Sequence, residues 1–321
     1  MPIWVLLLSA TLLVASVSQA AVVGEVISGR DMATGKWAVM SAVDGSQLTM
    51  MDCGGDLTHG GSPRYFVDLL NTGIVLPDDY GGNELIAYDE DCGIGVVITD
   101  EPSMRFYGPR WSPDGTRVAT FAERWDLSSG ERIEQGIYIA DVTLDATGRP
   151  ARASNFRLLV DLPNIPLLSW SGDGRRIAYN SSAPDLQGGT QTDIWVYDLD
   201  AEASVNVTNT PETSEREPAF SPLGDRVAFA RPTGAGWWDI FTVLASGGNE
   251  ISVTTKRTTG QPANRHPCFS PDGRYLSFNS SDYSKFYTES RIFKIRADGS
   301  GKAVSLYGRR GPVIHGAIWR P

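Results

Sequence analysis

A short pattern recurs through most of this 321-residue chain. An aromatic residue precedes a tight-turn sequence, most often Ser-Pro-Asp-Gly, and a basic residue and an apolar pair come after it. The matching segments are residues 109–121, 169–179, 218–229 and 267–278. Each segment predicts two strands joined by a tight turn, because glycine tolerates the positive φ that such a turn requires. Self-similarity of this kind indicates an array of equivalent units.

The distance between copies predicts the size of one unit. The aromatic anchors Trp111, Trp170, Phe220 and Phe269 are 59, 50 and 49 residues apart, and fifty more residues reach Trp319. Counting back 46 residues from Trp111 reaches Tyr65, in the related sequence Ser62-Pro63-Arg64-Tyr65. About fifty residues is the length of one four-stranded propeller blade. The spacing therefore predicts an all-β chain folded as a six-bladed β-propeller.

The last unit contains only one strand before the chain stops at Pro321. Three strand-like runs precede the first unit, at residues 22–28, 37–42 and 47–51. We expect these runs to complete the last blade, so that N-terminal strands and the C-terminal inner strand close the ring. Closure of this kind removes the exposed edges of an open array.

Later strands of the blades are predicted at residues 136–141, 193–198, 239–243 and 291–295, where apolar and polar residues alternate. The pairs Asp114-Gly115, Asp173-Gly174 and Asp272-Gly273 fall between the first two strands of their units. We interpret these aspartates as turn residues. A calcium site would need several oxygen ligands at one point, and copies spread around a ring do not provide them.

The repeat resembles that of the TolB-like propeller family, with its WD40-like Pro-Asp motif, over nearly the whole chain after residue 20. This resemblance implies the fold more than the function, because similar blades occur in binding proteins, in peptidases and in polysaccharide lyases. TolB itself carries an additional α/β domain before its propeller, whereas only about forty residues lie between residue 20 and the first unit here. The role of TolB is therefore not carried over.

The N-terminus predicts export. An apolar run at residues 3–17 is followed by small residues, as in a secretory signal peptide, and is shorter than a membrane span. We expect a signal peptide at 1–20, a propeller at 21–321, a periplasmic or secreted protein, no membrane span after cleavage, and a monomer. The net charge of −10 without a cluster of Lys or Arg argues against nucleic acid as a partner.

The three cysteines are too few for a disulfide scaffold or a cysteine zinc site. Cys53 and Cys92 are candidates for a disulfide after export, and Cys268 is predicted to be a buried thiol. Asn180, Asn206 and Asn279 each begin an Asn-x-Ser/Thr sequence, which carries a glycan only in a host that glycosylates it.

One mouth of the propeller channel is the expected functional face. Residues just before the inner strands lie there, together with the loops that join second and third strands. These loops are long, such as residues 123–135 with Trp125, and we expect their aromatic residues to be exposed. Such residues suit stacking on sugars or anchoring of a protein segment, although packing within their own blades is the alternative. The candidates are Tyr107, Trp125, Arg216, Glu217, Trp237, Arg265, His266, Tyr283 and His315.

We expect a non-catalytic protein that binds a protein or carbohydrate of the cell envelope or exterior, with no cofactor and no metal. The alternative is a polysaccharide lyase. His266 and His315 precede neighbouring inner strands and resemble the loop histidines that oligogalacturonate-lyase-like propellers use with a divalent metal. That family needs more histidines than the three in this chain, and the acidic protein disfavours an anionic uronate substrate.

Overall fold

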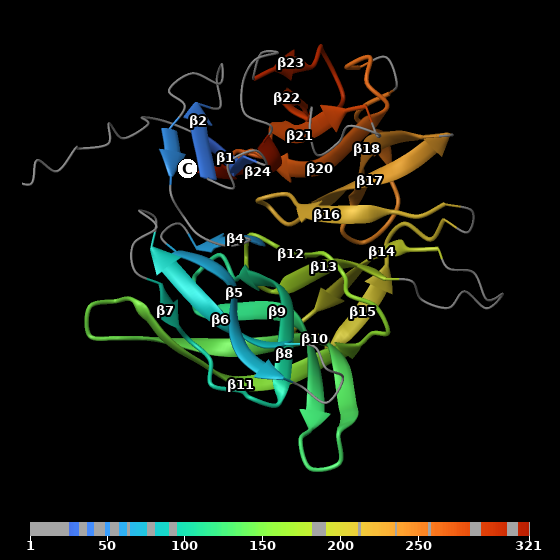
Figure 1. Cartoon of the computed structure of the whole chain (residues 1–321). Coiled ribbons are helices and arrows are strands. Elements are labelled where there is room, and N and C mark those ends of the chain that lie inside the picture. The colour runs from blue at the N-terminus through green and yellow to red at the C-terminus, as the bar shows by residue number, and fades with distance from the viewer. Residues whose placement is uncertain are drawn as a thin grey trace, which may run out of the picture.

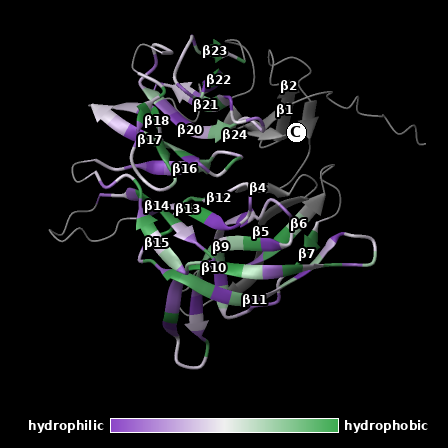
Figure 2. Cartoon of the chain, turned by 180° about the vertical axis from the view of Figure 1, so that it is seen from behind, coloured by the Kyte–Doolittle hydropathy of each residue, from purple (hydrophilic) through white to green (hydrophobic). Residues whose placement is uncertain are grey.

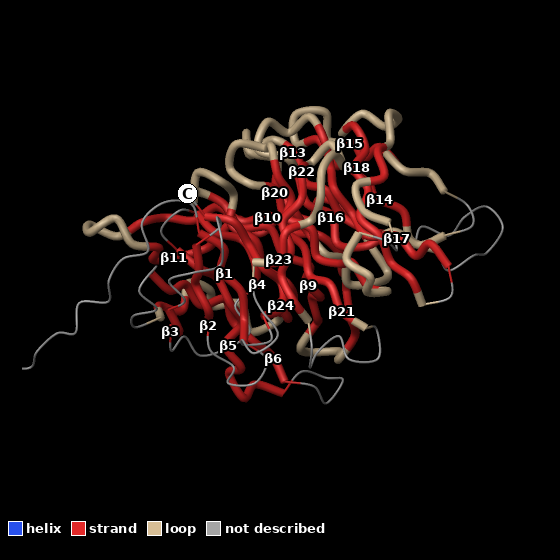
Figure 3. Tube along the Cα trace, turned by 90° about the horizontal axis from the view of Figure 1, so that it is seen from above, coloured by secondary structure: helices blue, strands red, loops and turns tan. Residues whose placement is uncertain are grey.

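The computed structural model describes the strands between residues 26 and 89 and residues 95–181, 191–210, 213–234, 236–255, 258–282, 290–306 and 314–320. Side chains are described at 83–87 and, within those ranges, from 95 to 306. Strands and loops make up this part of the chain, which contains no helix (Figure 3). It therefore also contains no helix that is long and apolar enough to span a bilayer.

The strands form antiparallel sheets that follow one another in chain order (Figure 1). One sheet contains β4 (Thr58–Ser62), β5 (Tyr65–Val75), β6 (Gly81–Asp89) and β7 (Val96–Val97). The next contains β8 (Met104–Trp111), β9 (Arg117–Asp126), β10 (Glu131–Leu144) and β11 (Pro150–Asp161). A third contains β12 (Leu168–Trp170), β13 (Arg176–Ser181), β14 (Asp193–Asp198) and β15 (Ala203–Asn206).

The remaining sheets continue this order. One run contains β16 (Arg216–Phe220), β17 (Arg226–Gly234), β18 (Trp237–Leu244) and β19 (Ile251–Ser252). A single parallel pair, Trp238 with Ala263, joins it to β20 (Ala263–Phe269), β21 (Tyr275–Ser281), β22 (Arg291–Arg296) and β23 (Val304–Ser305). The last sheet combines β24 (Ile314–Arg320) with β1 (Val26–Asp31), β2 (Trp37–Ser41) and β3 (Thr49–Met51).

The first strands of successive sheets contact one another. Contacts join β4 to β8, β8 to β12, β12 to β16, β16 to β20, and β20 to β24. These strands therefore line the inside of the arrangement, and the last strand of each sheet lies at its outer edge. Hydrophobic and hydrophilic residues alternate along many strands, as expected where one strand face is buried (Figure 2).

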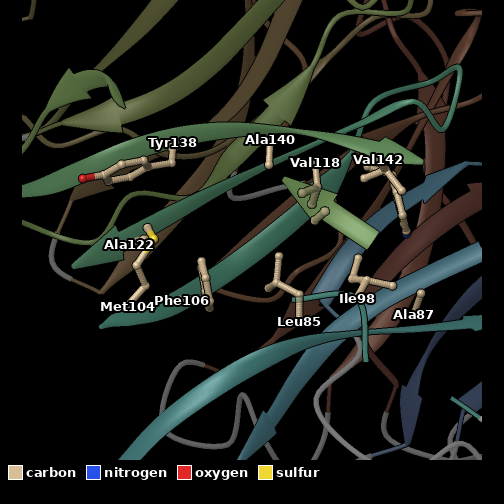
Figure 4. Close-up of a cluster of buried hydrophobic side chains, with 12 residues drawn as sticks. Leu85, Ala87, Ile98, Met104, Phe106, Val118, Ala122, Tyr138, Ala140 and Val142 are labelled. Carbon is tan, nitrogen blue, oxygen red and sulfur yellow. The ribbon is translucent and has the colours of Figure 1, made fainter. Parts of the chain in front are cut away.

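The hydrophobic core lies between neighbouring sheets. In one cluster Leu85 and Ile98 of the β4–β7 region pack against Met104, Phe106 and Tyr138 of the next sheet (Figure 4). Similar clusters join the β8–β11 sheet to the β12–β15 sheet, and each later sheet to the one after it as far as β22. Full burial of such a side chain contributes about 1.5–3 kcal/mol. The sheets are thus stabilised by their neighbours.

The predicted turns are confirmed. The hydroxyls of Ser112, Ser171 and Ser270 donate to the aspartate two residues later, at 2.5, 2.5 and 2.6 Å. The glycine after each aspartate has a φ between +67° and +71°. The same aspartate also accepts from a main-chain N–H two residues further on, at 3.0 Å in all three turns. These aspartates therefore hold their own turns together.

One copy of the turn has glycine where the others have proline. A Cβ atom at Gly172 would lie 2.0 Å from the carbonyl oxygen of Pro222, in the corresponding turn of the next sheet. No side chain fits there without movement of the main chain, so contact between two neighbouring turns explains the departure.

Two sequence predictions need correction. Tyr65 was expected near the end of an inner strand, but it begins β5, and β4 ends at Ser62. Ser62-Pro63 is therefore the counterpart of Ser112-Pro113, which follows fifty residues later. The counterpart of Trp111 is Gly61, four residues before Tyr65. The expected loop at 123–135 is also wrong, because β9 extends to Asp126 and β10 starts at Glu131.

Candidate functional site

The antiparallel order gives each sheet two distinct ends. The residues that precede a first strand and the connection from second to third strand lie at the same end, which we call the leading face. The Ser-Pro-Asp-Gly turns and the connections from third to fourth strand lie at the other end, which we call the turn face. The predicted site residues that the structure describes belong to the leading face. Those expected just before the inner strands lie within the first strands instead: Tyr107 in β8, Arg216 and Glu217 in β16, and Arg265 and His266 in β20.

A bulge interrupts the first strands just before a proline. Gly108, Glu217 and His266 have φ values of +52°, +61° and +53°, and the pairing register shifts at all three positions. Such a conformation costs a residue with a Cβ atom about 1–2 kcal/mol. Bulges redirect side chains and occur often beside functional sites. Glu217 and His266 hold this conformation in their strands, whereas the equivalent residue of β8 is Gly108, which adopts it without that cost.

The redirected Glu217 bridges two sheets. Its carboxylate accepts from the guanidinium of Arg265 and, at 2.6 Å, from the main-chain N–H of His266. The imidazole Nε2 of His266 lies 3.5 Å from the same carboxylate. Glu217 is only 5% exposed, and the guanidinium of Arg265 lies 4.7 Å from the ring centre of Trp238. We call Glu217, Arg265 and His266 the inter-sheet clamp.

Burial, and next the positive charge of Arg265, lower the pKa of His266 to about 3. The imidazole is therefore neutral at neutral pH, and the contact with Glu217 is not an ion pair under those conditions. The clamp consists of one carboxylate and one guanidinium whose charges compensate each other. This arrangement is suited to holding the strands β16 and β20 together.

A second charged cluster surrounds Glu123 on β9. Its carboxylate accepts from Arg105 at 3.2 Å, from the hydroxyl of Tyr107 at 3.1 Å and from Arg132 at 3.0 Å. The guanidinium groups of Arg105 and Arg132 lie 6.0 and 5.9 Å from the ring centre of Trp125. Burial raises the pKa of Tyr107, so its hydroxyl stays protonated as a donor.

Trp125 was predicted to be an exposed aromatic of a long loop, and this is wrong. It lies on strand β9 and is 9% exposed, with the guanidinium groups of Arg105 and Arg132 near its ring. Glu217 and Arg265 are likewise largely buried, with Arg265 16% exposed at the side chain. These three residues are structural parts of the leading face.

Arg216 and Trp237 lie outside the clamp and the Glu123 cluster. Arg216 is exposed beside the clamp, and Trp237 is half-buried at the start of β18. Tyr283 lies outside the described residues. The backbone of His315 is in β24 and pairs with Arg30, but its side chain also lies outside the described part. The predicted pairing of His266 with His315 therefore stays a prediction.

Sequence reasoning missed the exposed apolar residues of the leading face. They lie in the β9–β10 hairpin and in the connection from β11 to β12. The residues are Leu127, Ile133, Ile165 and Leu167, with Ile133 the most exposed at 61%. The main-chain N–H of Leu162 donates to the carbonyl of Gln135 at 3.4 Å, which holds the two segments together. The available signal was an isoleucine between Asn164 and Pro166, where a loop residue is normally polar.

Other polar groups contribute to structure. Asn279 is fully buried and its amide donates to Ser290 at 3.0 Å, so the folded chain has no room for a glycan at this position. The amide of Asn206 donates to Asp193 at 2.8 Å. Cys268 is half-buried rather than buried, and Cys53 and Cys92 lie outside the described residues. Within the described ranges, His, Cys, Asp and Glu side chains do not gather in groups of three or more that would hold a metal ion.

The comparisons with known proteins establish the fold. TolB from Acinetobacter baumannii matches with a TM-score of 0.63 at 17% identity, over 92% of this chain and 66% of that one. A protein described as a TolB from Agrobacterium tumefaciens matches with a TM-score of 0.57 at 20% identity, over 88% of each chain. This chain is thus an all-β protein with a β-propeller fold like that of TolB.

The chain spans slightly less than two thirds of the length of the Acinetobacter protein. At these identities the likeness concerns the fold alone. An oligogalacturonate lyase in complex with manganese matches with a TM-score of 0.48 at 13% identity, which is too low to support the lyase alternative. No protein-family model matches the chain, and no curated protein matches it in sequence.

Proposed function

We propose that this TolB-like β-propeller is a non-catalytic binding protein that holds a protein partner on its leading face. The observation that carries the proposal is the group of exposed apolar side chains at Leu127, Ile133, Ile165 and Leu167. Exposed apolar side chains that gather on one face are typical of protein interaction surfaces. These four share the leading face, in two segments that the hydrogen bond from Leu162 to Gln135 joins. The Glu123 cluster supports this surface, because it joins Arg105 of β8, Glu123 of β9 and Arg132 of β10 in the strands that lead to the β9–β10 hairpin.

Between protein and carbohydrate, the side chains that the structure describes favour protein. A sugar is usually held by an exposed aromatic ring, but Trp125 is buried and Trp237 is only half-exposed. Aliphatic side chains such as Ile133 and Ile165 gain little from the face of a sugar and more from an apolar protein surface. The partner is therefore expected to present an apolar patch.

We further propose that residues 21–321 form one six-bladed ring, exported after removal of residues 1–20. The antiparallel pairing of β1 with β24 supports closure by the two ends of the chain. The apolar N-terminal run supports a periplasmic or secreted location, although it lies outside the described residues. Mass measurement of the protein recovered from the periplasm or medium tests the cleavage after Ala20.

The binding function is tested by photocrosslinking. A photoreactive amino acid is placed at Ile133 or Ile165 in cells that produce the protein from its own promoter. Leu144 is the matched control, since it is comparably exposed but lies at the end of β10 on the turn face. We expect the same protein adduct from both leading-face positions and none from Leu144. Identical adducts from all three positions, or none from any, would refute the proposed surface.

A further inference from the structure

A groove of about 490 Å³ lies on the turn face, between the sheet of β16–β19 and the sheet of β20–β23. Its apolar lining includes Pro222, Leu223, Ile251, Phe269 and Tyr275. Three arginines and three aspartates also line it: Arg226, Arg274, Arg296, Asp225, Asp272 and Asp298. This volume is within the range of natural ligand sites, and the groove is at the opposite end of the sheets from the proposed protein-binding surface.

Leu223 departs from the repeat at this groove. The equivalent residues are Asp114, Asp173 and Asp272, each of which accepts a serine hydroxyl in its own turn. Leu223 is 82% exposed, more than any other large hydrophobic residue in the described ranges. A single exposed leucine needs no explanation in general, but this one replaces a residue that stabilises the turn.

A second substitution compensates for the lost aspartate. The hydroxyl of Ser221 donates instead to Asp225, at 2.6 Å, four residues along the chain. The position of Asp225 is occupied by Thr116, Arg175 and Arg274 in the other turns. The serine therefore keeps a carboxylate acceptor, while the tip of the turn presents an aliphatic side chain to solvent. The fold alone is satisfied by the ordinary Asp-Gly turn and does not require this exchange.

The charges around the groove favour an anionic ligand group. The pKa of Asp272 is lowered by hydrogen bonds, the largest effect coming from the hydroxyl of Ser270. The pKa of Asp298 is lowered in the same way, mainly by the hydroxyl of Ser300. Both carboxylates are therefore ionised and engaged in their own turns. Asp225 is engaged by Ser221. The three arginines of the groove differ in how far their guanidinium groups are already engaged within the protein.

Arg226 donates to the carbonyls of Thr242 and Asn249 at 3.2 and 2.7 Å, so its guanidinium is already used. Arg274 has a side chain that is 81% exposed and only a long, 3.7 Å contact with Asp272. Arg296 is also exposed at the groove. The donors still available for a ligand are therefore the guanidinium groups of Arg274 and Arg296, which match a carboxylate.

We propose that this groove binds a peptide segment of a partner protein in which an aliphatic side chain stands next to a carboxylate. The aliphatic side chain packs against Leu223, Phe269 and Pro222. The carboxylate is held by Arg274 and Arg296 at the rim. Because the groove is on the turn face, this site is independent of the surface proposed for the leading face.

The test uses defined peptides and the full-length mature protein with methyl-labelled leucine. The probes are capped tetrapeptides with central Leu-Asp, Leu-Lys or Ala-Asp residues, titrated to millimolar concentration while the Leu223 methyl resonances are followed. Leu223→Asp is the decisive variant, because it restores the residue of the other turns and is expected to fold. Leu127→Ser, on the leading face, is the matched control for loss of an exposed leucine.

We expect the Leu-Asp peptide to shift the Leu223 resonances with a dissociation constant on the order of 1 mM. The Leu-Lys and Ala-Asp peptides should bind at least about fivefold more weakly. Amide resonances of Gly273 and Ala297 report binding to Leu223→Asp, for which we expect a similar loss, whereas Leu127→Ser should leave binding unchanged. Equal binding of all three peptides, no shift at all, or unaltered binding to Leu223→Asp would overturn the proposal.

Discussion

Glu217→Ala is predicted to destabilise the protein by about 3–5 kcal/mol, the usual cost of removing one member of a buried ion pair. The carboxylate is almost inaccessible and accepts from the guanidinium of Arg265 and from the N–H of His266. Without it, the largely buried guanidinium of Arg265 and the main-chain N–H of His266 lose a carboxylate acceptor. The contacts join β16 to β20, so the loss falls on the junction of two sheets.

The assay is reversible urea unfolding followed by tryptophan fluorescence. Glu250→Ala is the control, since Glu250 is a partly exposed carboxylate that pairs with Arg231 at 2.7 Å, and we expect a change of about 1 kcal/mol or less. The double variant Glu217→Ala with Arg265→Ala should lose less than the sum of the single losses, because the two residues interact directly and each single variant already removes that interaction.

A third comparison isolates the backbone. Glu217 has a φ of +61°, which glycine adopts without the cost paid by other residues. Glu217→Gly should therefore be more stable than Glu217→Ala by about 1 kcal/mol, although both lack the carboxylate. A Glu217→Ala variant within about 1 kcal/mol of the parent would refute the reasoning about the clamp. Equal stability of the Gly and Ala variants would refute the part that concerns strain.

Three further predictions follow from the described contacts. Gly172→Ala should lower the free energy of unfolding by about 2 kcal/mol or more, because its Cβ atom would lie 2.0 Å from the Pro222 carbonyl oxygen. An unchanged free energy of unfolding in chemical denaturation would contradict that contact. Burial raises the pKa of Glu215 to about 7 against an ordinary 4.5, so the folded state binds a proton more tightly than the unfolded state, and the free energy of unfolding should fall as pH rises from 4.5 to 7. Glu215→Gln should remove this pH dependence, and a variant with the same change in unfolding free energy over that range would argue against it. Asn279→Ala should destabilise the protein by about 1–3 kcal/mol, because it removes the amide that donates to Ser290 in a buried site. Asn180→Ala should cost less, because Asn180 is half-buried and accepts one hydrogen bond from the N–H of Leu167, and equal losses in thermal unfolding would contradict this ranking.

The repeated turns and the strands around them were predictable because their signals are local. A turn sequence such as Ser270-Pro-Asp-Gly contains its own donors and acceptors, and neighbouring apolar residues must alternate if one face of a strand is buried. The unit of about fifty residues then implied the propeller. The register of the first unit was not predictable, because its sequence keeps only Ser62-Pro63 of the motif. Pro63 can be matched either to Pro109 or to Pro113 of the next unit, and the structure shows that Pro113 is the right counterpart.

The clamp was only partly predictable. Glu217 and His266 both precede a proline at equivalent positions of neighbouring units, so the register predicts that they lie close together. Their burial does not follow from the register, because it depends on a bulge that turns the carboxylate toward the next sheet. Trp125 was misplaced for a related reason, since the sequence does not show that two arginines from different strands pack on its ring.

The pairing of β1 with β24 has a consequence for synthesis of the chain. The β1–β3 segment leaves the ribosome early, but the strand that pairs with its inner edge comes from residues 314–320. Until then β1 exposes unpaired main-chain groups on that edge. Each of the other sheets obtains all its strands from one continuous stretch of chain, so all its pairing partners are present once that stretch has emerged. The sheet built first in sequence is thus completed last in time, and the early strands need protection from other edges during this interval.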